Sequence, residues 1–423
     1  MRLPEDFINE MKDIVPKFDD FLNSYNQKPA RAFKVNGNKI SAADYIALCG
    51  QRENVPFAAD CFYAIENEIR GTHPYHHAGM IYFQEPSAMS VVNAFDIDVD
   101  LALDMCAAPG GKTVQLADKV KYLVSNDITP SRALTLKSNV ERMGFTNVAV
   151  TCNDPCEFEK CGQIFDLILV DAPCSGEGMF RKDETAVAQW SKEHSLSCAD
   201  RQYAILLSAD KALRQGGTII YSTCTFSVAE NEGVIERFLQ NHDYELVKPS
   251  QRITDYTTYL THPYMRRFYP HLGKGEGQFF AAIRKVEGGS IRRKDSRVKS
   301  DYSVAAFVKE LTGLSLDCVR YGDNFYIPAM PYALDLRYMS GGVRVGGYVG
   351  KTFKPDHYLF SAYGSFMQNA VLDEDAAVKY IKGEQLEGSM KGFGAVTIGG
   401  ASLGGVKGDG SVLKNLYPKG LRN

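Results

Sequence analysis

The sequence lacks any long apolar run. Nowhere in its 423 residues do about 18 apolar residues follow one another, which is close to the minimum for a membrane-spanning helix. Residues 1–20 are acidic and interrupted by prolines, so the apolar core of a secretory signal is missing as well. We therefore expect a cytoplasmic protein that does not enter a membrane.

Metal-binding patterns are also missing. The chain has ten cysteines but no Cys-x-x-Cys pair, and no histidine follows Cys152, Cys156 and Cys161 at the spacing of a zinc finger. A cluster of three histidines between residues 73 and 77 has no carboxylate or cysteine at short range. We predict free thiols, as in a reducing compartment, and no metal site.

Composition is that of an ordinary globular protein, with 44% hydrophobic residues, 23% charged residues and a net charge of −3. At roughly 150 residues per domain, the length predicts about three domains. Two segments are more basic than this average. Residues 284–299 carry seven lysines and arginines against two acidic residues, and residues 391–423 carry five against one. Such segments are commonly solvated linkers or tails, but beside a nucleic-acid enzyme they are expected to contact phosphates.

The hydrophobic pattern divides the chain into four parts. Residues 1–95 combine short amphipathic helices with one alternating strand, and residues 96–286 alternate apolar strands with helices. The second pattern is typical of a mainly parallel α/β sheet that is covered on both faces. A basic linker, 287–300, leads to a strand-rich region, 301–423. The predicted strands of the α/β domain are 101–105, 122–125, 148–151, 165–170, 218–222 and 278–283, and Gly216 and Gly217 are expected to end the helix before the fifth strand.

A glycine-rich loop follows the first predicted strand of the α/β domain. Ligands of open α/β sheets bind beyond the carboxyl ends of the strands, and Gly110 and Gly111 let the backbone approach a ligand closely. A proline interrupts the dinucleotide-binding pattern, and Cys106 stands where a phosphate loop needs glycine. Asp127 follows this loop at close to the sequence spacing at which an acidic residue hydrogen bonds the ribose hydroxyls in Rossmann folds. Acidic residues at three successive strand ends favour a ligand site over helix caps or turns.

Two cysteines follow two later strands of the same domain. Cys174 comes three residues after Asp171, and Cys224 follows the fifth strand. Carbon 5 of cytosine is too weak a nucleophile to take a methyl group unless a thiolate first adds to carbon 6. One cysteine can attack while the other assists release of the product, and Asp171 can hydrogen bond a ring nitrogen. Cysteine is among the most buried residue types, but strand-end positions beside a cofactor loop favour catalysis over inert packing.

These motifs resemble those of the Sun family of RNA 5-methylcytosine methyltransferases. The matching stretches are 104–113, 171–178 and 221–225, followed by Glu230-Asn231-Glu232. Further stretches resemble the RsmF type of bacterial 16S ribosomal RNA methyltransferase, namely 80–89, 180–183, and 403–408 with 413–418.

The resemblance implies a Rossmann-like class I methyltransferase domain that uses S-adenosylmethionine to methylate carbon 5 of cytosine in RNA. Cys224 would be the nucleophile, and Cys174 would help to eliminate the enzyme from the methylated base. The small N-terminal α/β domain, 1–95, and the β-rich, PUA-like region, 301–423, would be accessory RNA-binding domains. The residues implied to hold the cofactor are Cys106, Ala107, Ala108, Pro109, Gly110, Gly111, Lys112, Asp127, Asp154 and Asp171.

Two basic residues just beyond the Cys174 loop, Arg181 and Lys182, are expected to meet phosphates near the reacting nucleotide, unless they form an exposed turn. The target base must swing out of any stack to reach the cysteines. We expect a monomer whose partner is ribosomal RNA or the small ribosomal subunit.

Three alternatives stay open at this point. Only the resemblance selects ribosomal RNA over transfer RNA. A noncatalytic RNA-binding assembly factor with the same fold would bind RNA without depending on the cofactor. A DNA cytosine methyltransferase would use Cys174 as its nucleophile.

Overall fold

The computed structural model describes residues 3–65, 70–291 and 299–422. Four basic residues of the predicted linker, Arg292, Arg293, Lys294 and Arg297, lie outside the described residues. None of the helices in the described part is long and apolar enough to cross a membrane.

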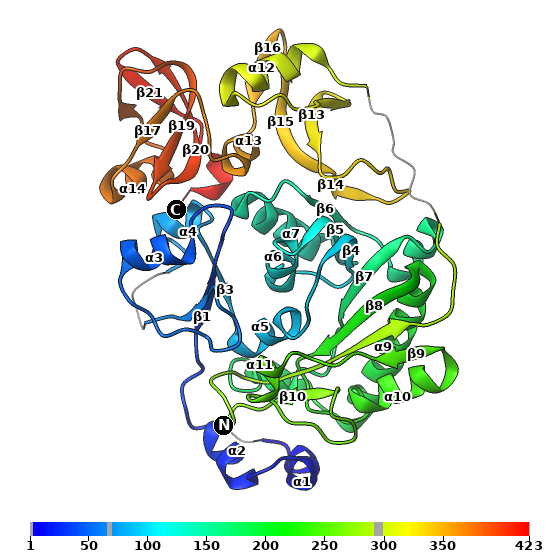
Figure 1. Ribbon diagram of the computed structural model, residues 1–423. Coiled ribbons are helices and arrows are strands. Elements are labelled where there is room, and N and C mark those ends of the chain that lie inside the picture. The colour runs from blue at the N-terminus through cyan, green and yellow to red at the C-terminus, as the bar shows by residue number, and fades with distance from the viewer. Residues whose placement is uncertain (1–2, 66–69, 292–298, 423) are drawn as a thin grey trace.

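A nine-stranded sheet forms the centre of the molecule, in the order β10-β11-β8-β7-β4-β5-β6-β14, with β9 beside β11 (Figure 1). The strands from β8 to β6 run parallel, and β11 and β14 pair with their neighbours antiparallel. Each strand predicted for the α/β domain is present. The strands of this sheet are β4 (Val99–Asp104), β5 (Val120–Asn126), β6 (Val148–Thr151), β7 (Phe165–Asp171), β8 (Leu213–Thr223), β9 (Tyr244–Leu246), β10 (Arg266–Phe268), β11 (Gln278–Lys285) and β14 (Tyr338–Ser340).

The central strands are buried on both faces because alternate side chains enter two separate core clusters. In β7, Leu167 and Leu169 pack in one cluster, while Ile168 and Val170 pack in the other. The helices over the first face are α5 (Pro86–Asn93), α6 (Gly111–Ala117), α7 (Pro130–Met143) and α11 (Gln251–Thr254). Those over the second face are η1 (Pro155–Cys161), α9 (Lys192–Ala212) and α10 (Glu232–Asn241).

The prediction that Gly216 and Gly217 end the helix before β8 is wrong. The helix already ends at Ala212, and both glycines lie within β8. Leu213 is fully buried and pairs with Phe165 of β7. Pairing and burial at Leu213 therefore start the strand before the glycines are reached, so tertiary contacts override a local signal.

The two ends of the chain share one hydrophobic core. Phe33 and Met80 of the N-terminal unit belong to the same buried cluster as Tyr380 and Val406 of the C-terminal unit. Figure 1 shows the blue N-terminal strands directly below the orange and red C-terminal strands. The N-terminal sheet has the order β2-β1-β3 and the C-terminal sheet β17-β19-β20-β21-β18. Their elements are β1 (Ala32–Val35), α3 (Ala42–Cys49), β2 (Cys61–Tyr63), α4 (Pro74–His77), β3 (Ile81–Gln84), β17 (Asn369–Val371), α14 (Glu374–Lys382), β18 (Leu386–Glu387), β19 (Lys391–Ile398), β20 (Ala401–Asp409), β21 (Val412–Asn415) and η3 (Lys419–Leu421).

A further four-stranded sheet, β12-β13-β15-β16, precedes the C-terminal one. Between β13 and β15 the chain leaves this sheet, packs several apolar side chains on the second face of the central sheet, and adds β14 beside β6. Region 301–423 therefore holds two sheets and also completes the α/β domain. The elements are α12 (Tyr302–Thr312), β12 (Val319–Tyr321), β13 (Asn324–Pro328), β15 (Gly342–Val349), β16 (Thr352–Pro355) and α13 (His357–Ala362).

Two N-terminal helices, α1 (Glu5–Ile14) and α2 (Phe18–Ser24), pack on loops that follow the central strands. Phe21 of α2 is fully buried, and its ring lies 5.5 Å from that of Phe226 and 6.1 Å from that of Tyr269. Phe226 comes two residues after Cys224, so α2 supports the loop that carries this cysteine.

We predict that Phe21→Ala lowers the free energy of unfolding by about 3–5 kcal/mol, because it leaves a cavity among buried aromatic rings. Urea denaturation followed by circular dichroism measures the loss. Phe18→Ala, one turn earlier at a half-buried position, is the matched control and should cost less than half as much. Equal losses from the two variants would contradict the packing described for α2.

Candidate active site

Strands β7 and β8 bring the two predicted catalytic cysteines together. Their register places Asp171 opposite Ser222, and the chain reaches Cys174 and Cys224 a few residues beyond these positions. The two Sγ atoms lie 3.3 Å apart. Both residues are partly exposed, so neither cysteine is sealed in the core and a ligand can approach the pair.

The two cysteines interact with each other through their sulfur atoms. A hydrogen bond to the Cys224 sulfur, and then burial, raises the pKa of Cys174 well above its ordinary value. Either sulfur can be the donor of this hydrogen bond. Burial and nearby carboxylates also raise the pKa of Cys106 in the neighbouring loop. Because the thiolate is the reactive form of cysteine, one member of the pair has to lose its proton before it can attack a ligand.

Asp171 joins the cofactor loop to the strand that leads to Cys224. Its Oδ2 atom accepts a hydrogen bond from Nζ of Lys112 at 2.7 Å, and its Oδ1 atom accepts one from the hydroxyl of Ser222 at 2.7 Å. The Lys112 side chain is 9% exposed and that of Asp171 is 32% exposed. The carboxyl group is therefore held in one orientation with an edge open to a ligand.

Buried Glu230 holds the loop after Cys174. Its carboxylate accepts hydrogen bonds from the backbone N–H of Ser175 at 3.0 Å, from the amide of Gln202 at 2.8 Å and from the hydroxyl of Ser195 at 2.8 Å. Ser175 and Thr225, the residues after the two cysteines, also share a hydrogen bond of 2.8 Å between their hydroxyls. Sequence motifs included Glu230 but gave no role for it, because its partners lie far away in the chain.

A glycine sets the close approach of the two cysteine loops. The N–H of Gly178 donates to the carbonyl of Cys224 at 2.8 Å, and a Cβ atom at this position would lie 2.7 Å from that oxygen. Any side chain at Gly178 would therefore push the loops apart.

The predicted cofactor loop is held from outside by α7 and β3. The carbonyl of Ala108 accepts from Arg132 at 2.7 Å, and that of Pro109 accepts from Asn139 at 2.9 Å and from the Tyr82 hydroxyl at 3.3 Å. Gly110, the residue just before α6, has a φ of 114°, a conformation that favours glycine.

The predicted strand-end acids differ in their surroundings. Asp127 is 1% exposed, accepts from the N–H of Thr129 and pairs with Arg132 at 3.3 Å. Asp154 is exposed and caps η1, accepting from the N–H of Cys156 at 3.0 Å. The turn-forming role that the sequence analysis considered for these acids thus exists at both positions, and Arg132 contacts the second oxygen of Asp127.

Asp104 is a site residue that the sequence did not single out as a cofactor ligand. It is fully buried, and burial raises its pKa to about 7. Oδ2 accepts from the Thr113 hydroxyl at 2.7 Å, whereas Oδ1 has no hydrogen-bond partner among the described residues. Buried polar atoms are nearly always bonded, so the free oxygen fits a cationic or N–H group of a ligand in the loop.

Arg181 does not lie free to meet phosphates. Its guanidinium is 7% exposed, contacts Glu276 at 2.6 Å and donates to the carbonyls of Ser24 and Gly275. Lys182 is more exposed and lies 3.6 Å from the same Glu276. The expected role of Arg181 is therefore replaced by a structural one, since it ties α2 to the site loops.

The central sheet, with its parallel middle strands and antiparallel β11, together with the glycine-rich loop after β4, defines a Rossmann-like class I methyltransferase. Family models agree with this class. The model of the 16S rRNA methyltransferases RsmB/F matches residues 95–284, that of the N-terminal domain of RsmF matches 3–86, and that of the RsmF PUA domain matches 369–423.

Curated relatives extend the match to the whole chain. The chain is 31% identical to the ribosomal RNA small subunit methyltransferase F of Shewanella woodyi, over 100% of this chain and 97% of that protein. It is 30% identical to the protein of the same name from Klebsiella pneumoniae, over 99% and 96%. The chain belongs to the ribosomal RNA small subunit methyltransferase F family.

Among solved structures, a methyltransferase homologue from Pyrococcus horikoshii is 27% identical, with a TM-score of 0.56, over 67% of this chain and all of that one. The family confirms the expected class I domain with its N-terminal and PUA-like companions, and S-adenosylmethionine as the methyl donor.

The raised pKa of Asp104 has a consequence for stability. Burial favours the protonated form of Asp104 in the folded chain. The stability that this protonated group contributes is therefore fully present below about pH 4 and is lost as the pH rises through about 7. Asparagine does not titrate, so Asp104→Asn should not lose this stability. We predict that, without cofactor, the difference in the free energy of unfolding between Asp104→Asn and the natural chain shifts in favour of the variant by about 2–3 kcal/mol from pH 5 to pH 8. Urea unfolding at the two pH values measures this difference, and parallel curves for both proteins would contradict it.

Proposed function

We propose that this chain methylates carbon 5 of a cytosine in 16S ribosomal RNA through a transient bond between Cys224 and carbon 6. The observation that carries the proposal is the 3.3 Å contact between the sulfur atoms of Cys174 and Cys224, beside a carboxyl group fixed by Lys112 and Ser222. The ribosomal substrate is taken from the names of the relatives.

The first step is addition. The thiolate of Cys224 donates an electron pair to carbon 6, and the pair of the 5,6 double bond shifts toward carbon 5 and the ring nitrogen. Asp171 lies opposite Ser222, two residues before Cys224, and its carboxyl group would give a proton to that nitrogen, so that the displaced electron pair ends in an N–H bond. The proton would return to the carboxylate when the adduct breaks down. Lys112 and Ser222 keep the carboxyl group in place for this contact.

The second step makes the new carbon–carbon bond and then breaks the carbon–sulfur bond. S-adenosylmethionine, when bound, would supply an electrophilic methyl group to the electron pair at carbon 5, and the broken methyl–sulfur bond would leave its pair on S-adenosylhomocysteine. A base then removes the proton from carbon 5, the C–H pair restores the 5,6 double bond, and Cys224 leaves with the carbon–sulfur pair. Cys174 lies 3.3 Å from the leaving sulfur, and we assign it to this elimination.

Several groups would hold the methyl donor. The loop from Cys106 to Lys112 allows close backbone approach, and the free Oδ1 of Asp104 suits the amino group of the methionine part. Asp127 would take the ribose hydroxyls. Asp154 would lie at the adenine end, where Ile128, 53% exposed beside Asp127, offers an apolar contact.

The accessory units, which share one hydrophobic core, would bind RNA, and residues 369–423 match the family model of the RsmF PUA domain. A cytoplasmic location and a monomeric state stay predictions. A noncatalytic assembly factor would need neither the sulfur pair nor the unpaired Oδ1 atom of Asp104. Their joint presence supports an enzyme.

We predict that Cys224→Ala lowers methylation at least about a thousand-fold, because the activating adduct cannot form. Cys174→Ala should form the adduct but release it slowly, so that a protein–RNA band persists in denaturing gels. Incorporation of labelled methyl groups and gel shift are measured together. Cys49→Ala, at a partly exposed cysteine of α3 in the N-terminal unit, is the control and should behave as the natural chain. The reverse pattern, with an adduct in Cys224→Ala, would show that the roles are exchanged, as in the DNA-type alternative.

Substrate choice is tested separately. Bisulfite sequencing of total RNA from cells that lack the gene should show the loss of 5-methylcytosine at a position in 16S ribosomal RNA, and the purified chain should restore it. Loss in transfer RNA alone would overturn the ribosomal assignment, while an unchanged pattern in all RNA would overturn the cytosine assignment.

A further inference from the structure

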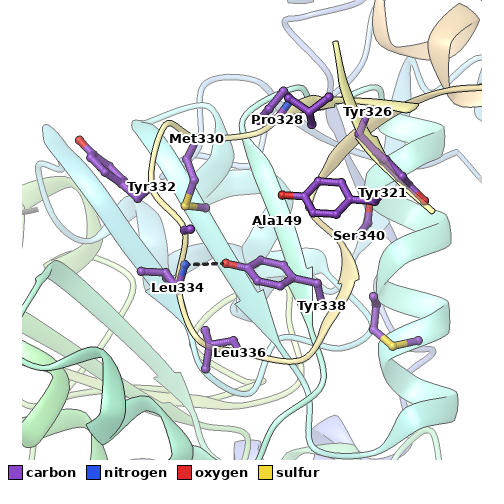
Figure 2. Close-up of a pocket in the computed structure, with 14 residues that line it drawn as sticks. Ala149, Tyr321, Tyr326, Pro328, Met330, Tyr332, Leu334, Leu336, Tyr338 and Ser340 are labelled. Atoms are coloured by element: carbon purple, nitrogen blue, oxygen red, sulfur yellow. Dashed lines mark hydrogen bonds between the residues drawn. The ribbon is translucent and has the colours of Figure 1, made fainter. Parts of the chain in front are cut away.

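A tyrosine-lined pocket lies where the four-stranded sheet meets the edge of the central sheet. Its volume is about 520 Å3. Figure 2 shows Tyr321 and Tyr326 on one side, the segment with Met330 and Tyr332 on the other, and Tyr338 between them. No charged side chain is among those that line it. Apart from Ala149, the residues that line the pocket lie outside the stretches matched by the three family models.

The tyrosine rings are held in place but stay open to solvent. The hydroxyl of Tyr338 accepts a hydrogen bond from the N–H of Leu334 at 3.3 Å. The rings of Tyr321 and Tyr326 pack edge to face, with centroids 6.1 Å apart. Tyr321 is nevertheless 63% exposed and Tyr338 36% exposed. Aromatic surface is therefore presented to solvent in a fixed arrangement, which suits a flat ligand.

We propose that this pocket binds one unpaired nucleobase of the RNA substrate, distinct from the base that is methylated. The proposal rests on the proposed function, because an RNA substrate is what brings bases to this surface. A base is flat, aromatic and uncharged, and single-stranded RNA is commonly recognised by stacking bases on aromatic side chains. The uncharged lining accepts such a group and excludes a phosphate, which would lose its hydration without gaining a cation.

The rim of the pocket offers a place for the backbone of the same nucleotide. Arg320, next to Tyr321, is 64% exposed; its Nε atom donates to the carbonyl of Gly322 at 2.8 Å, and the ion pair of its outer nitrogen with exposed Asp323 is long, at 3.9 Å. A pair of this length between exposed side chains contributes little, so Arg320 can turn to a phosphate. The volume lies within the range of roughly 300–1,000 Å3 of small-ligand sites, which suits a single nucleotide better than a protein surface.

The pocket is joined rigidly to the reacting end of the molecule. Tyr338 lies on β14, opposite Thr151 of β6. The preceding residue, Arg337, donates from Nε to the carbonyl of Cys152 at 2.7 Å, and its backbone N–H donates to the side chain of Asn153 at 2.9 Å. A base in the pocket would therefore fix the RNA relative to the sheet that carries the cysteines.

The test compares Tyr321→Ala with Tyr302→Ala. Both residues are exposed tyrosines of the same region, but Tyr302, 83% exposed on α12, does not line the pocket. With 16S ribosomal RNA that lacks the modification, Tyr321→Ala should raise KM about ten-fold or more and leave kcat within two-fold, since stacking binds the RNA without touching the reacting atoms. Tyr321→Phe should restore KM, and Tyr302→Ala should leave both constants unchanged.

A second measurement identifies the contact itself. The RNA is prepared with 5-iodouridine in place of uridine, irradiated with the natural chain, and the cross-linked peptide is identified by mass spectrometry. Cross-links at Tyr321, Tyr326 or Tyr338 support the pocket. An active natural chain with no such cross-link, and with equal KM for Tyr321→Ala and Tyr302→Ala, would overturn the inference. Absence of 5-methylcytosine from the reaction of the natural chain would instead overturn the proposed function.

Discussion

Two strands, β7 and β8, must pair with Asp171 opposite Ser222 for the sulfur atoms beyond them to meet. A slip of one residue would turn the side chains of β7 to the opposite faces of the sheet and would exchange the two core clusters. Burial of apolar residues on both faces therefore fixes the register, and the register fixes the site. The catalytic geometry depends on the same packing that stabilises the sheet.

Buried carboxylates then hold the loops that follow these strands. Glu230 accepts hydrogen bonds from three segments of the chain. Glu232 forms a buried ion pair with Arg267, and Arg267 also donates to the carbonyl of Phe226. A buried charge is costly unless it is paired and hydrogen-bonded, so each of these groups favours one loop arrangement. The helices α1 and α2 cover the same loops through Phe21. The ends of the chain thereby support a centre that is distant from them in sequence.

Local patterns in the sequence predicted the strands, the cofactor loop and the meeting of two strand ends. These features depend on periodicity and on the rule that ligands lie beyond the carboxyl ends of parallel strands. Contacts between distant segments could not be predicted in this way. Arg181 has the sequence context of an exposed basic turn, yet its partner Glu276 lies 95 residues later. Likewise, nothing local to Tyr338 indicates that β14 joins the central sheet.

RNA that contains 5-fluorocytosine tests the central claim most directly, because fluorine on carbon 5 cannot leave as a proton does and the adduct should persist. The natural chain is incubated with this RNA and S-adenosylmethionine, digested, and the linked peptide is sequenced by mass spectrometry. The account predicts a stable complex joined through Cys224. A link through Cys174, or methylation of ordinary RNA with no complex on the fluorinated one, would contradict it.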